Sequence, residues 1–351
     1  MYAVTRASFI NPGAHHERMR YAPPSMPLRL TARAARFVAI LIALQTATSC
    51  KRSPEVVVFH AASLSRAFAE LEQRYRARYP DERLRVEVSG SLVAARKVAE
   101  LGLRADVVAV ADAAVIDRLL RPDHAAWNLH FSTNQVVLAH KDHSRFTDEL
   151  TADNWPEVVA RDGVRLGLVN PDTGPIGYRT LFVWQLEARR RSVEPATLEQ
   201  TLRARCAPEH YVPDESQLLA LLEARAVDYA FLYRSTAEEH HLKITALSDE
   251  VNLGDAARAE AYGAASTPVR MRAQGPATEV RGAPVIYGLT IPASATNPSG
   301  AERLVALLLG DEGQRVLRRS GFSPLTPPRC SPLGAVPAGL QDRCRPEGGT
   351  P

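Results

Sequence analysis

The sequence predicts an α/β protein built from two lobes. Runs of β-branched residues such as Val56–Phe59 alternate with segments whose apolar residues recur at helical spacing. Strands that alternate with helices of this length form right-handed βαβ units and a mostly parallel sheet. The residues after the N-terminal leader, about 300 of them, are enough for two separate cores. We expect the strand V-V-L-A-H after Gln135 to carry the chain from the first lobe to the second.

Residues 1–49 have the pattern of a secretory signal peptide. Three arginines, the last of them Arg36, precede the short apolar core F-V-A-I-L-I-A-L. This core is too short to span a membrane as a stable helix. The residues A-T-S-C at its end resemble a lipobox, in which Cys50 is acylated and becomes the mature N-terminus at the outer face of a membrane. The alternative is ordinary cleavage with Cys50 incidental.

The charge balance excludes one class of partner. The whole chain has a net charge of +4, but six arginines and a single glutamate lie before Cys50. The rest therefore carries 37 basic and 38 acidic side chains, a net charge of −1. It contains no basic stripe with interleaved aromatic residues, so we expect no nucleic-acid partner.

Three strand–helix units are predicted to open the first lobe. Val56–Phe59 is a buried strand, the small residues Ala61 and Ala62 form a turn, and Ser63-Leu64-Ser65 begins a helix. The next two units have strands over 84–88 and 105–112, followed by helices over 92–102 and 115–120. We place the first part of this lobe at 50–134.

The second lobe is expected over residues 135–287, followed by a return to the first lobe over 288–328 and a Pro-rich tail over 329–351. Residues 256–283 have no clear period and predict a loose connection with one edge strand, and everything after Thr326 is expected to be poorly ordered. The predicted elements are helices over 151–159, 180–188, 216–225, 301–309 and 311–322, and strands over 164–169, 227–233 and 284–292.

Small hydroxyl residues lie where predicted strands end and helices begin. A helix start leaves backbone N–H groups without partners, which suits an anion. In an open α/β sheet, ligands bind beyond the carboxyl ends of the strands. Donors that converge there can solvate an oxyanion without a countercharge, although a single serine at such a place is more often a plain helix cap. The residues are Ser63, Ser65, Ser89, Ser91, Thr173 and Ser235, with Gly90, Gly174 and Gly177 beside them.

Two groups of histidines could indicate a catalytic or a metal site, but neither has the pattern that such a site needs. His60 lies near Ser63, but no acid is placed to orient it and no G-x-S-x-G elbow exists, so we expect no hydrolase. His240 and His241 are adjacent at a helix end, where neighbouring side chains point apart, which argues against a metal site.

The cysteines agree with export. Cys330 and Cys344 suit a disulfide in an oxidising compartment, and Cys206 is then expected to be a buried small residue. No pair has the spacing of a zinc site. Trp127, Trp155 and Trp184 are expected in the cores. Arg179 and Arg234 are expected either to pair with Asp172 or Asp228 or to lie near the ligand.

Seven motifs occur in a fixed order between Val56 and Pro327. In the order and spacing of these seven motifs, the chain resembles the periplasmic tungstate- and molybdate-binding proteins of ABC importers. Overall it is most similar to their tungstate-binding branch. The resemblance implies the two-lobed periplasmic-binding-protein type II fold, in which each lobe is a mixed, mostly parallel sheet flanked by helices. The motifs are H-A-A-S-L-S at 60–65, S-G-S at 89–91, A-D-V-V-A-V-A-D at 105–112, S-T-N-Q-V-V at 132–137, N-P-D-T-G-P-I-G-Y-R at 170–179, Y-A-F-L-Y-R-S at 229–235 and P-V-I-Y-G-L-T-I-P at 284–292.

The resemblance also implies a set of ligand-binding residues. Ser63 and Ser91 match donors of the first lobe, and Tyr287 matches a phenol that reaches the anion near the hinge. The matches from the second lobe are Gly174, Pro175, Ile176 and Leu232, and the neighbours that can add to the set are Ala62, Ser65, Gly90, Asp172 and Tyr233.

One departure from the family pattern decides the expected binding mode. The tungstate-binding branch uses two carboxylates to complete an octahedral metal, and this chain has Gly174 and Leu232 where the resemblance places them. Asp172 is close to the first position but does not match it. We therefore expect a tetrahedral oxyanion, molybdate or tungstate, held by hydrogen bonds alone, with no metal site beyond that anion. Sulfate, which has the same charge and shape, is the alternative.

The implied function is that of a receptor with no enzymatic activity and no cofactor. We expect a monomer in the periplasm, or lipid-anchored at the outer face of a bacterial membrane, that delivers the anion to ABC permease subunits. Binding is expected to favour a closed arrangement of the lobes. An enzyme on the same fold would need a titratable pair in the cleft, which the sequence does not reveal. A ligand-sensing regulator would need a DNA-binding or signalling segment, and the signal peptide argues against it.

Overall fold

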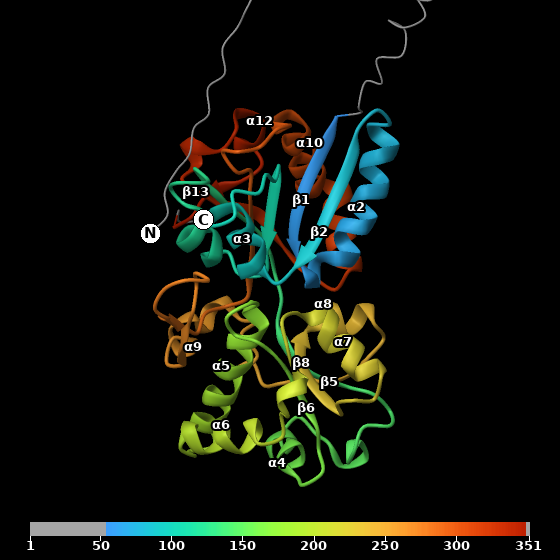
Figure 1. Cartoon of the computed structure of the whole chain (residues 1–351), viewed down its shortest axis with the longest axis vertical. Helices are drawn as coiled ribbons and strands as arrows, with labels where there is room; N and C mark the ends of the chain where they lie inside the picture. Colours follow the sequence, from blue (N-terminus) through green and yellow to red (C-terminus); the bar gives the residue numbers. More distant parts are fainter. Residues whose placement is uncertain (1–53, 349–351) are drawn as a thin grey trace, which may run out of the picture. The chain divides into compact units, whose positions relative to one another are not determined.

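Two large mixed β-sheets, each with its own helices, and one small two-stranded sheet form the described part of the chain (Figure 1). A computed structural model describes residues 54–348, so the predicted signal peptide and Cys50 lie outside the described residues. The predicted α/β class is confirmed. We call the seven-stranded sheet with its helices the first lobe, and the five-stranded sheet with its helices the second lobe.

The first-lobe sheet has the strand order β14-β13-β4-β12-β3-β1-β2. Strand β1 is parallel to β2 and β3, whereas β12 and β13 run antiparallel to β4. The turns that follow the three parallel strands therefore lie at one edge of the sheet. The bounds are β1 Glu55–Ala61, β2 Arg83–Ser89, β3 Val107–Val110, β4 Asn128–Thr133, β12 Ile286–Thr290, β13 Ser323–Ser331 and β14 Arg345–Pro346.

The second-lobe sheet has the order β7-β6-β8-β5-β9. Strand β6 is parallel to β7 and β8, and β5 is antiparallel to β8 and β9. The carboxyl ends of β6 and β8 thus share an edge. The bounds are β5 Val136–His140, β6 Leu166–Val169, β7 Tyr211–Val212, β8 Tyr229–Tyr233 and β9 Lys243–Thr245.

Helices surround both sheets (Figure 1). In the first lobe they are the short η1 Ala62–Leu64, α2 Ser65–Arg78, α3 Ser91–Ala99, η2 Ile116–Leu120, α10 Pro298–Leu309, α11 Asp311–Arg319, η6 Leu333–Ala335 and α12 Ala338–Gln341. In the second lobe they are η3 Thr147–Glu149, α4 Trp155–Ala160, α5 Pro175–Arg190, α6 Pro195–Arg203, η4 Pro208–His210, α7 Glu215–Glu223 and α8 Arg234–Glu239, with η5 Ala256–Arg258 and α9 Ala259–Tyr262 before the return.

Local sequence patterns explain β1 and α2, the first long elements of the described residues. Strand β1 is buried from Val56 to Ala61, as its β-branched run predicts. Helix α2 buries Phe68, Leu71 and Tyr75, which lie on one helical face. In the second lobe Trp155 and Trp184 each pack edge-on against Phe231, so both are core residues as expected.

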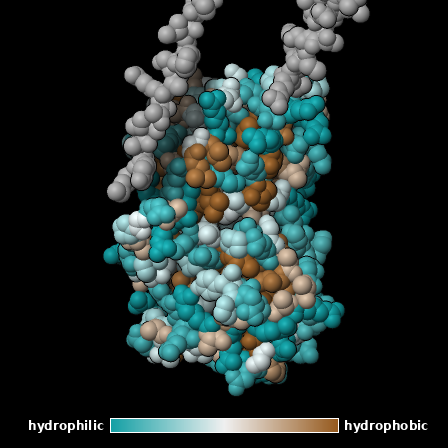
Figure 2. Space-filling model, viewed as in Figure 1, coloured by the Kyte–Doolittle hydropathy of each residue, from teal (hydrophilic) through white to brown (hydrophobic). Residues whose placement is uncertain are grey.

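The face seen in Figure 2 is mostly hydrophilic, with hydrophobic residues in separate patches.

Two predictions about the later part of the chain were wrong. Residues 256–283 hold two strands, β10 Ser266–Val269 and β11 Thr278–Arg281, which pair antiparallel with each other instead of giving one edge strand. The segment after Thr326 is ordered up to residue 348, because β13 pairs with β4 and Val336 and Leu340 are buried.

The prolines explain why that segment looked unstructured from sequence. The pairing of β13 with β4 skips between Pro324 and Arg329, so the prolines in between need not donate hydrogen bonds to the sheet. The expected disulfide Cys330–Cys344 is confirmed and ties β13 to the segment between α12 and β14. Cys206 is half-buried, and burial raises the pKa of its thiol to about 11, which makes it a poor nucleophile.

Candidate functional site

A small cavity lies where strands of both lobes end. Its walls come from the turns after β1, β2 and β3 in the first lobe, and from the turns after β6 and β7 and the last residue of β8 in the second. This is the edge that ligands occupy in open α/β sheets. The cavity is narrow: about 10 Å³ is open to the centre of a water molecule, roughly the room for a single water. It is lined by Ala61, Ala62, Ser63, Gly90, Ser91, Ala111, Val169, Gly174, Pro175, Ile176, Asp214, Glu215 and Tyr233.

The structure brings together most of the residues predicted for the site. Of the matched set, Ser63, Ser91, Gly174, Pro175 and Ile176 line the cavity, and so do Ala62, Gly90 and Tyr233 from the neighbouring set.

Ser63 is held by the returning strand of the first lobe. Tyr287 on β12 donates a hydrogen bond from its hydroxyl to Ser63 Oγ at 2.9 Å. Burial raises the pKa of Tyr287 well above its usual range, so the phenol keeps its proton and remains a donor. Since Ser63 Oγ accepts this bond, its own O–H is left to donate, and here it bonds the carboxyl group of Glu215. Tyr287 itself does not line the cavity and reaches it through Ser63.

Ser91 has an equivalent arrangement at the start of α3. Its Oγ accepts a hydrogen bond from the backbone N–H of Ala111 at 3.0 Å, and its side chain is fully buried. The Ser91 O–H is therefore also available to donate. Gly90 precedes it as the N-cap of α3. A Cβ atom on Gly90 would lie 2.3 Å from the Thr173 carbonyl oxygen, so only glycine permits this approach of the two lobes.

Helix α5 adds backbone donors from the second lobe. It begins at Pro175, with Gly174 as its N-cap in extended conformation. Proline has no N–H and is well suited to this position, and the next residue, Ile176, presents one of the first-turn N–H groups that find no partner within a helix. The positive end of the helix dipole is thus directed at the cavity.

Glu215, the first residue of α7, is a cavity residue that the sequence analysis missed. Its side chain is 4% exposed, and its Oε1 accepts the backbone N–H of Tyr233 at 3.3 Å. Burial raises the pKa of Glu215 to about 8, although hydrogen bonds from Tyr233 and Ser63 act in the opposite direction. The carboxyl group is therefore mainly protonated at neutral pH.

A sequence signal for Glu215 existed but was incomplete. Asp214 caps α7 by accepting the N–H of Gln217 at 3.1 Å, a D-x-x-Q pattern that marks a helix start. The pattern predicts where α7 begins, but it does not predict that the first turn of α7 lies beside Tyr233 at the cavity. The sequence does not reveal a titratable pair at the cleft, but Asp214 and Glu215 both line the cavity.

Besides Tyr287, three residues predicted for the site do not line this cavity. Leu232 is fully buried on β8 and pairs with Val137 of β5. Ser65 donates from its hydroxyl to the Ala62 carbonyl at 2.7 Å. Asp172 accepts the N–H of Arg270 at 2.7 Å.

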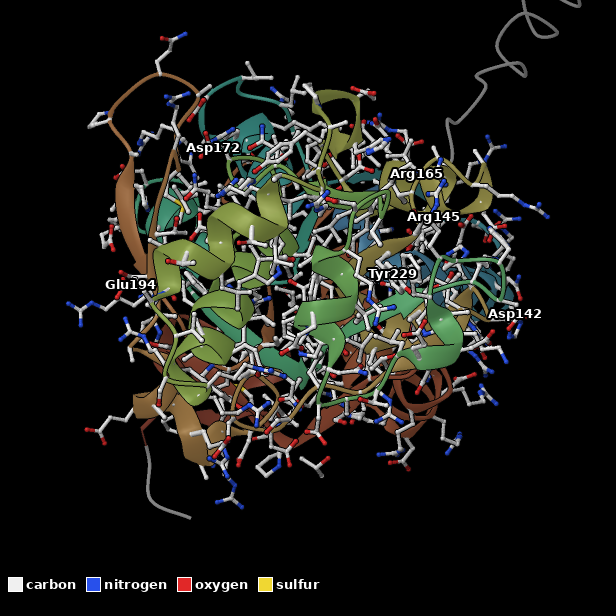
Figure 3. All side chains as sticks on the ribbon, turned by 90° about the horizontal axis from the view of Figure 1, so that it is seen from below. Asp142, Arg145, Arg165, Asp172, Glu194 and Tyr229 are labelled. Atoms are coloured by element: carbon white, nitrogen blue, oxygen red, sulfur yellow. A yellow bond between two sulfur atoms is a disulfide. The ribbon has the colours of Figure 1, made fainter. Side chains whose placement is uncertain are left out.

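The two arginines considered for the ligand have other partners. Arg179, 2% exposed, donates from Nη1 to the Ala111 carbonyl and to the Tyr233 hydroxyl, each at 2.6 Å. Arg234 pairs with Glu238 at 2.6 Å. Neither pairs with Asp228, which accepts from Arg145 at 2.7 Å and from Arg165 at 3.3 Å, two arginines that lie close together in Figure 3.

Comparison with known proteins places this architecture. Residues 56–323 match the family model described as bacterial extracellular solute-binding protein. The chain belongs to this family of solute-binding proteins. An uncharacterized solute-binding protein of Petrotoga mobilis is 36% identical over 288 residues, covering 82% of this chain and 89% of that one.

A second relative is named for the anions that it binds. The molybdate/tungstate-binding protein WtpA of Pyrococcus abyssi is 32% identical over 303 residues, covering 79% of this chain and 87% of the relative. The resemblance drawn from the motifs is thereby confirmed. The periplasmic molybdate-binding protein of Azotobacter vinelandii shares the fold at a TM-score of 0.53 and 15% identity, covering 76% of this chain and 98% of its own. The two-lobed type II fold is therefore confirmed.

His60, which lies near Ser63 in the sequence, has surroundings that keep it neutral. His60 is buried against Phe68, and burial lowers its pKa to about 4, so it is neutral. Its Nδ1 is 2.8 Å from the Ala61 carbonyl oxygen, so it is not directed at Ser63. Within residues 54–348 no three His, Cys, Asp or Glu side chains are grouped to hold a metal ion. No helix in that range is long and apolar enough to cross a bilayer.

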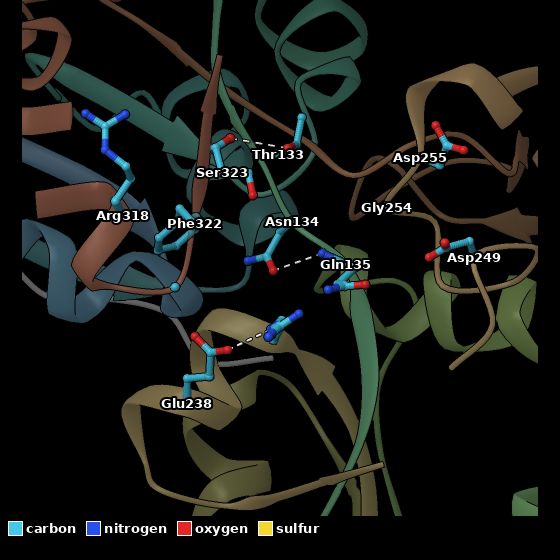
Figure 4. Close-up of a pocket in the computed structure, with 12 residues that line it drawn as sticks. Thr133, Asn134, Gln135, Glu238, Asp249, Gly254, Asp255, Arg318, Phe322 and Ser323 are labelled. Atoms are coloured by element: carbon cyan, nitrogen blue, oxygen red, sulfur yellow. Dashed lines mark hydrogen bonds and ion pairs between the residues drawn. The ribbon is translucent and has the colours of Figure 1, made fainter. Parts of the chain in front are cut away.

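A larger cavity of the solute-binding protein lies at the strand that joins the lobes (Figure 4). Asn134 and Gln135 lie between β4 and β5 on one wall, and Arg318 lies on another. Three carboxylates, Glu238, Asp249 and Asp255, also line it, and they would repel a dianion. None of the residues matched to the ligand lies there, so the smaller cavity is the better candidate for an anion.

Proposed function

We propose that this solute-binding protein captures a tetrahedral oxyanion, molybdate or tungstate, in the cavity between Ser63 and Ser91. The observation that carries the proposal is that both serine oxygens already accept a hydrogen bond from the protein, so that both hydroxyls are oriented as donors. The Ser63 hydroxyl, which bonds the Glu215 carboxyl group here, would turn to the anion when it enters. A relative that is 32% identical is named for molybdate and tungstate, which supports this choice of anion.

The donor set is neutral and comes from both lobes. The first lobe offers the hydroxyls of Ser63 and Ser91 and the N–H groups at the start of α3, and the second offers the N–H of Ile176 at the start of α5. Such dipoles stabilise a dehydrated dianion without an ion pair in contact with it. The buried guanidinium of Arg179 does not line the cavity but bonds to Ala111 and Tyr233, which do. Its positive charge therefore adds a favourable field for an anion.

Glu215 takes part as a carboxylic acid. Because burial raises its pKa to about 8, it holds a proton at neutral pH and can donate a hydrogen bond to an oxygen of the anion. A carboxylate at the same place would face a dianion across a few ångströms. With Gly174 and Leu232 where the resemblance places the metal-binding carboxylates, we propose that the anion stays tetrahedral.

Transport follows from closure of the lobes. We propose that the two lobes close around the anion and that the anion holds them together by bonding to both. The closed, monomeric receptor, anchored to the outer face of the membrane through Cys50, then delivers the anion to the permease subunits of its ABC importer.

Calorimetric titration of the purified chain with molybdate, tungstate and sulfate tests the proposal. We expect one molybdate or tungstate per chain, and sulfate weaker by about tenfold or more because a smaller anion cannot reach all donors at once. Perchlorate, tetrahedral but singly charged, serves as the control and should bind much more weakly. Sulfate binding as tight as molybdate binding would overturn the choice of anion, and no heat with any of the three would overturn the oxyanion site.

A further inference from the structure

Helix α5 contacts the first lobe with side chains that do not line the anion cavity. Tyr178 donates from its hydroxyl to Asp112 Oδ2 at 2.5 Å. Arg179 donates from Nη1 to the Ala111 carbonyl at 2.6 Å, and its Nη2 lies 3.6 Å from Asp112 Oδ2. Ala111 and Asp112 directly follow β3 of the first lobe, whereas α5 belongs to the second. These contacts therefore join the two lobes.

The contacts belong to an arrangement in which the lobes are together. Tyr178 and Arg179 are 1% and 2% exposed, and a buried guanidinium is tolerated only when it is paired and fully hydrogen-bonded. Two of the three partners of Arg179, Ala111 and Asp112, are on the opposite lobe. If the lobes separated, both contacts would be lost and the guanidinium and the phenol would return to water.

Arg179 is also connected to the walls of the anion cavity. On the first lobe, the Ala111 carbonyl accepts a hydrogen bond from Arg179, and the Ala111 N–H donates one to Ser91 Oγ. On the second lobe, the Tyr233 hydroxyl accepts from Arg179 at 2.6 Å, and Tyr233 lines the cavity. The same guanidinium thus holds one cavity wall from each lobe in place.

We propose that Tyr178, Arg179 and Asp112 form a latch between the lobes that sets how slowly the bound anion leaves. The three are positioning residues, because none of them lines the cavity. The proposal rests on the proposed anion-binding function only for the identity of the trapped ligand. A latch acts after the anion has entered, so it affects the dissociation rate and leaves the association rate nearly unchanged.

The latch is tested with two single variants and a matched control. Tyr178→Phe removes the hydroxyl that donates to Asp112 and keeps the ring, and Asp112→Asn removes the carboxylate charge that faces Arg179. The control is Tyr75→Phe, because the Tyr75 hydroxyl likewise donates to a carboxylate, that of Glu82, but within the first lobe alone. Stopped-flow fluorescence gives the molybdate association and dissociation rates of each protein.

We expect dissociation from Tyr178→Phe and from Asp112→Asn to be about tenfold faster, the cost of one charge-assisted hydrogen bond, with association unchanged. Tyr75→Phe should keep the wild-type rates even if its melting temperature falls. Equal dissociation rates for the wild type and both latch variants would overturn the proposal, as would an equal effect of Tyr75→Phe.

A second measurement keeps the latch separate from the identity of the anion. Spin labels at Leu101→Cys and Val193→Cys, exposed positions in the first and second lobe, report the distance between the lobes in a chain with Cys50→Ser and Cys206→Ser. Without any anion, Tyr178→Phe should populate longer distances than the wild type. This result would support the latch even if molybdate failed to bind, whereas identical distance distributions would contradict it.

Discussion

The hydroxyl of Tyr287 donates a hydrogen bond to Ser63 Oγ at 2.9 Å across 224 positions of sequence. The bond joins the turn after the first strand to the strand that returns from the second lobe. It occupies an acceptor site of Ser63 and so directs the serine proton elsewhere. Ser91 is placed in the same way by the N–H of Ala111, and this pair of oriented hydroxyls is the basis of the proposed anion site.

Removal of either oriented hydroxyl should weaken binding. We expect Ser63→Ala and Ser91→Ala each to cost about 1–3 kcal/mol of molybdate binding free energy, the loss of one donor to a buried charge. Calorimetry measures the effect. Ser65→Ala is the control, because the Ser65 hydroxyl donates to the Ala62 carbonyl and does not line this cavity, so its affinity should match the wild type. Unchanged affinity in both test variants would remove Ser63 and Ser91 from the site.

A methyl group at Gly90 should prevent the lobes from closing. The added Cβ would lie 2.3 Å from the Thr173 carbonyl oxygen, and backbone on both sides leaves little room to adjust. We expect Gly90→Ala to weaken anion binding by about 1–3 kcal/mol, the usual cost of overpacking, with little effect on the melting temperature without anion. Gly334→Ala, where no atom lies within 4 Å of the added Cβ, is the control and should bind normally. Wild-type affinity in Gly90→Ala would contradict this account of closure.

The proton on Glu215 should make binding depend on pH. If the neutral carboxyl donates to the anion, molybdate affinity falls as pH rises through about 8, where Glu215 becomes charged. Glu215→Gln keeps a neutral side chain with donors, so it should bind with nearly wild-type affinity at pH 7 and lose this pH dependence. Titrations from pH 6 to 9.5 measure both. Loss of binding in Glu215→Gln at pH 7 would instead indicate that a carboxylate bonds the metal directly.

The same group should affect the stability of the protein without anion. The unfolded chain loses the Glu215 proton near the ordinary pKa of 4.5, whereas the folded chain holds it up to about 8. The folded state thus binds more protons between these values, so the free energy of unfolding decreases as pH rises from 4.5 to 8. The shift corresponds to about 4–5 kcal/mol across this range as an upper estimate. Urea unfolding of the wild type and Glu215→Gln should show a steeper decline in the wild type, and parallel curves would contradict the raised pKa.

Much of the fold could be predicted because its signals are local. The β-branched run at Val56–Phe59 and the helical spacing after Ser65 depend only on neighbouring residues, and both elements form as expected. The junctions after parallel strands could also be predicted to meet, since βαβ topology brings the carboxyl ends of such strands to one edge. Ser63 and Ser91 were found in this way.

The failures concern contacts between distant segments. The position of Glu215 depends on the approach of α7 to Tyr233 and Ser63, which no local pattern contains. Leu232 was matched through a motif, but the alternation of side chains along β8 leaves its neighbour Tyr233 at the cavity. The order of the C-terminal segment depends on the disulfide Cys330–Cys344 and on pairing with β4, both formed across the fold.

Anomalous scattering from tungsten in crystals grown with tungstate tests the central claim most directly. The proposed site predicts a single tungsten peak in the smaller cavity, within hydrogen-bonding reach of Ser63 and Ser91 through the oxygens of the anion, with only those four oxygens bound to the metal. A peak in the larger cavity beside Asn134, or a Glu215 oxygen bonded to the tungsten, would contradict it.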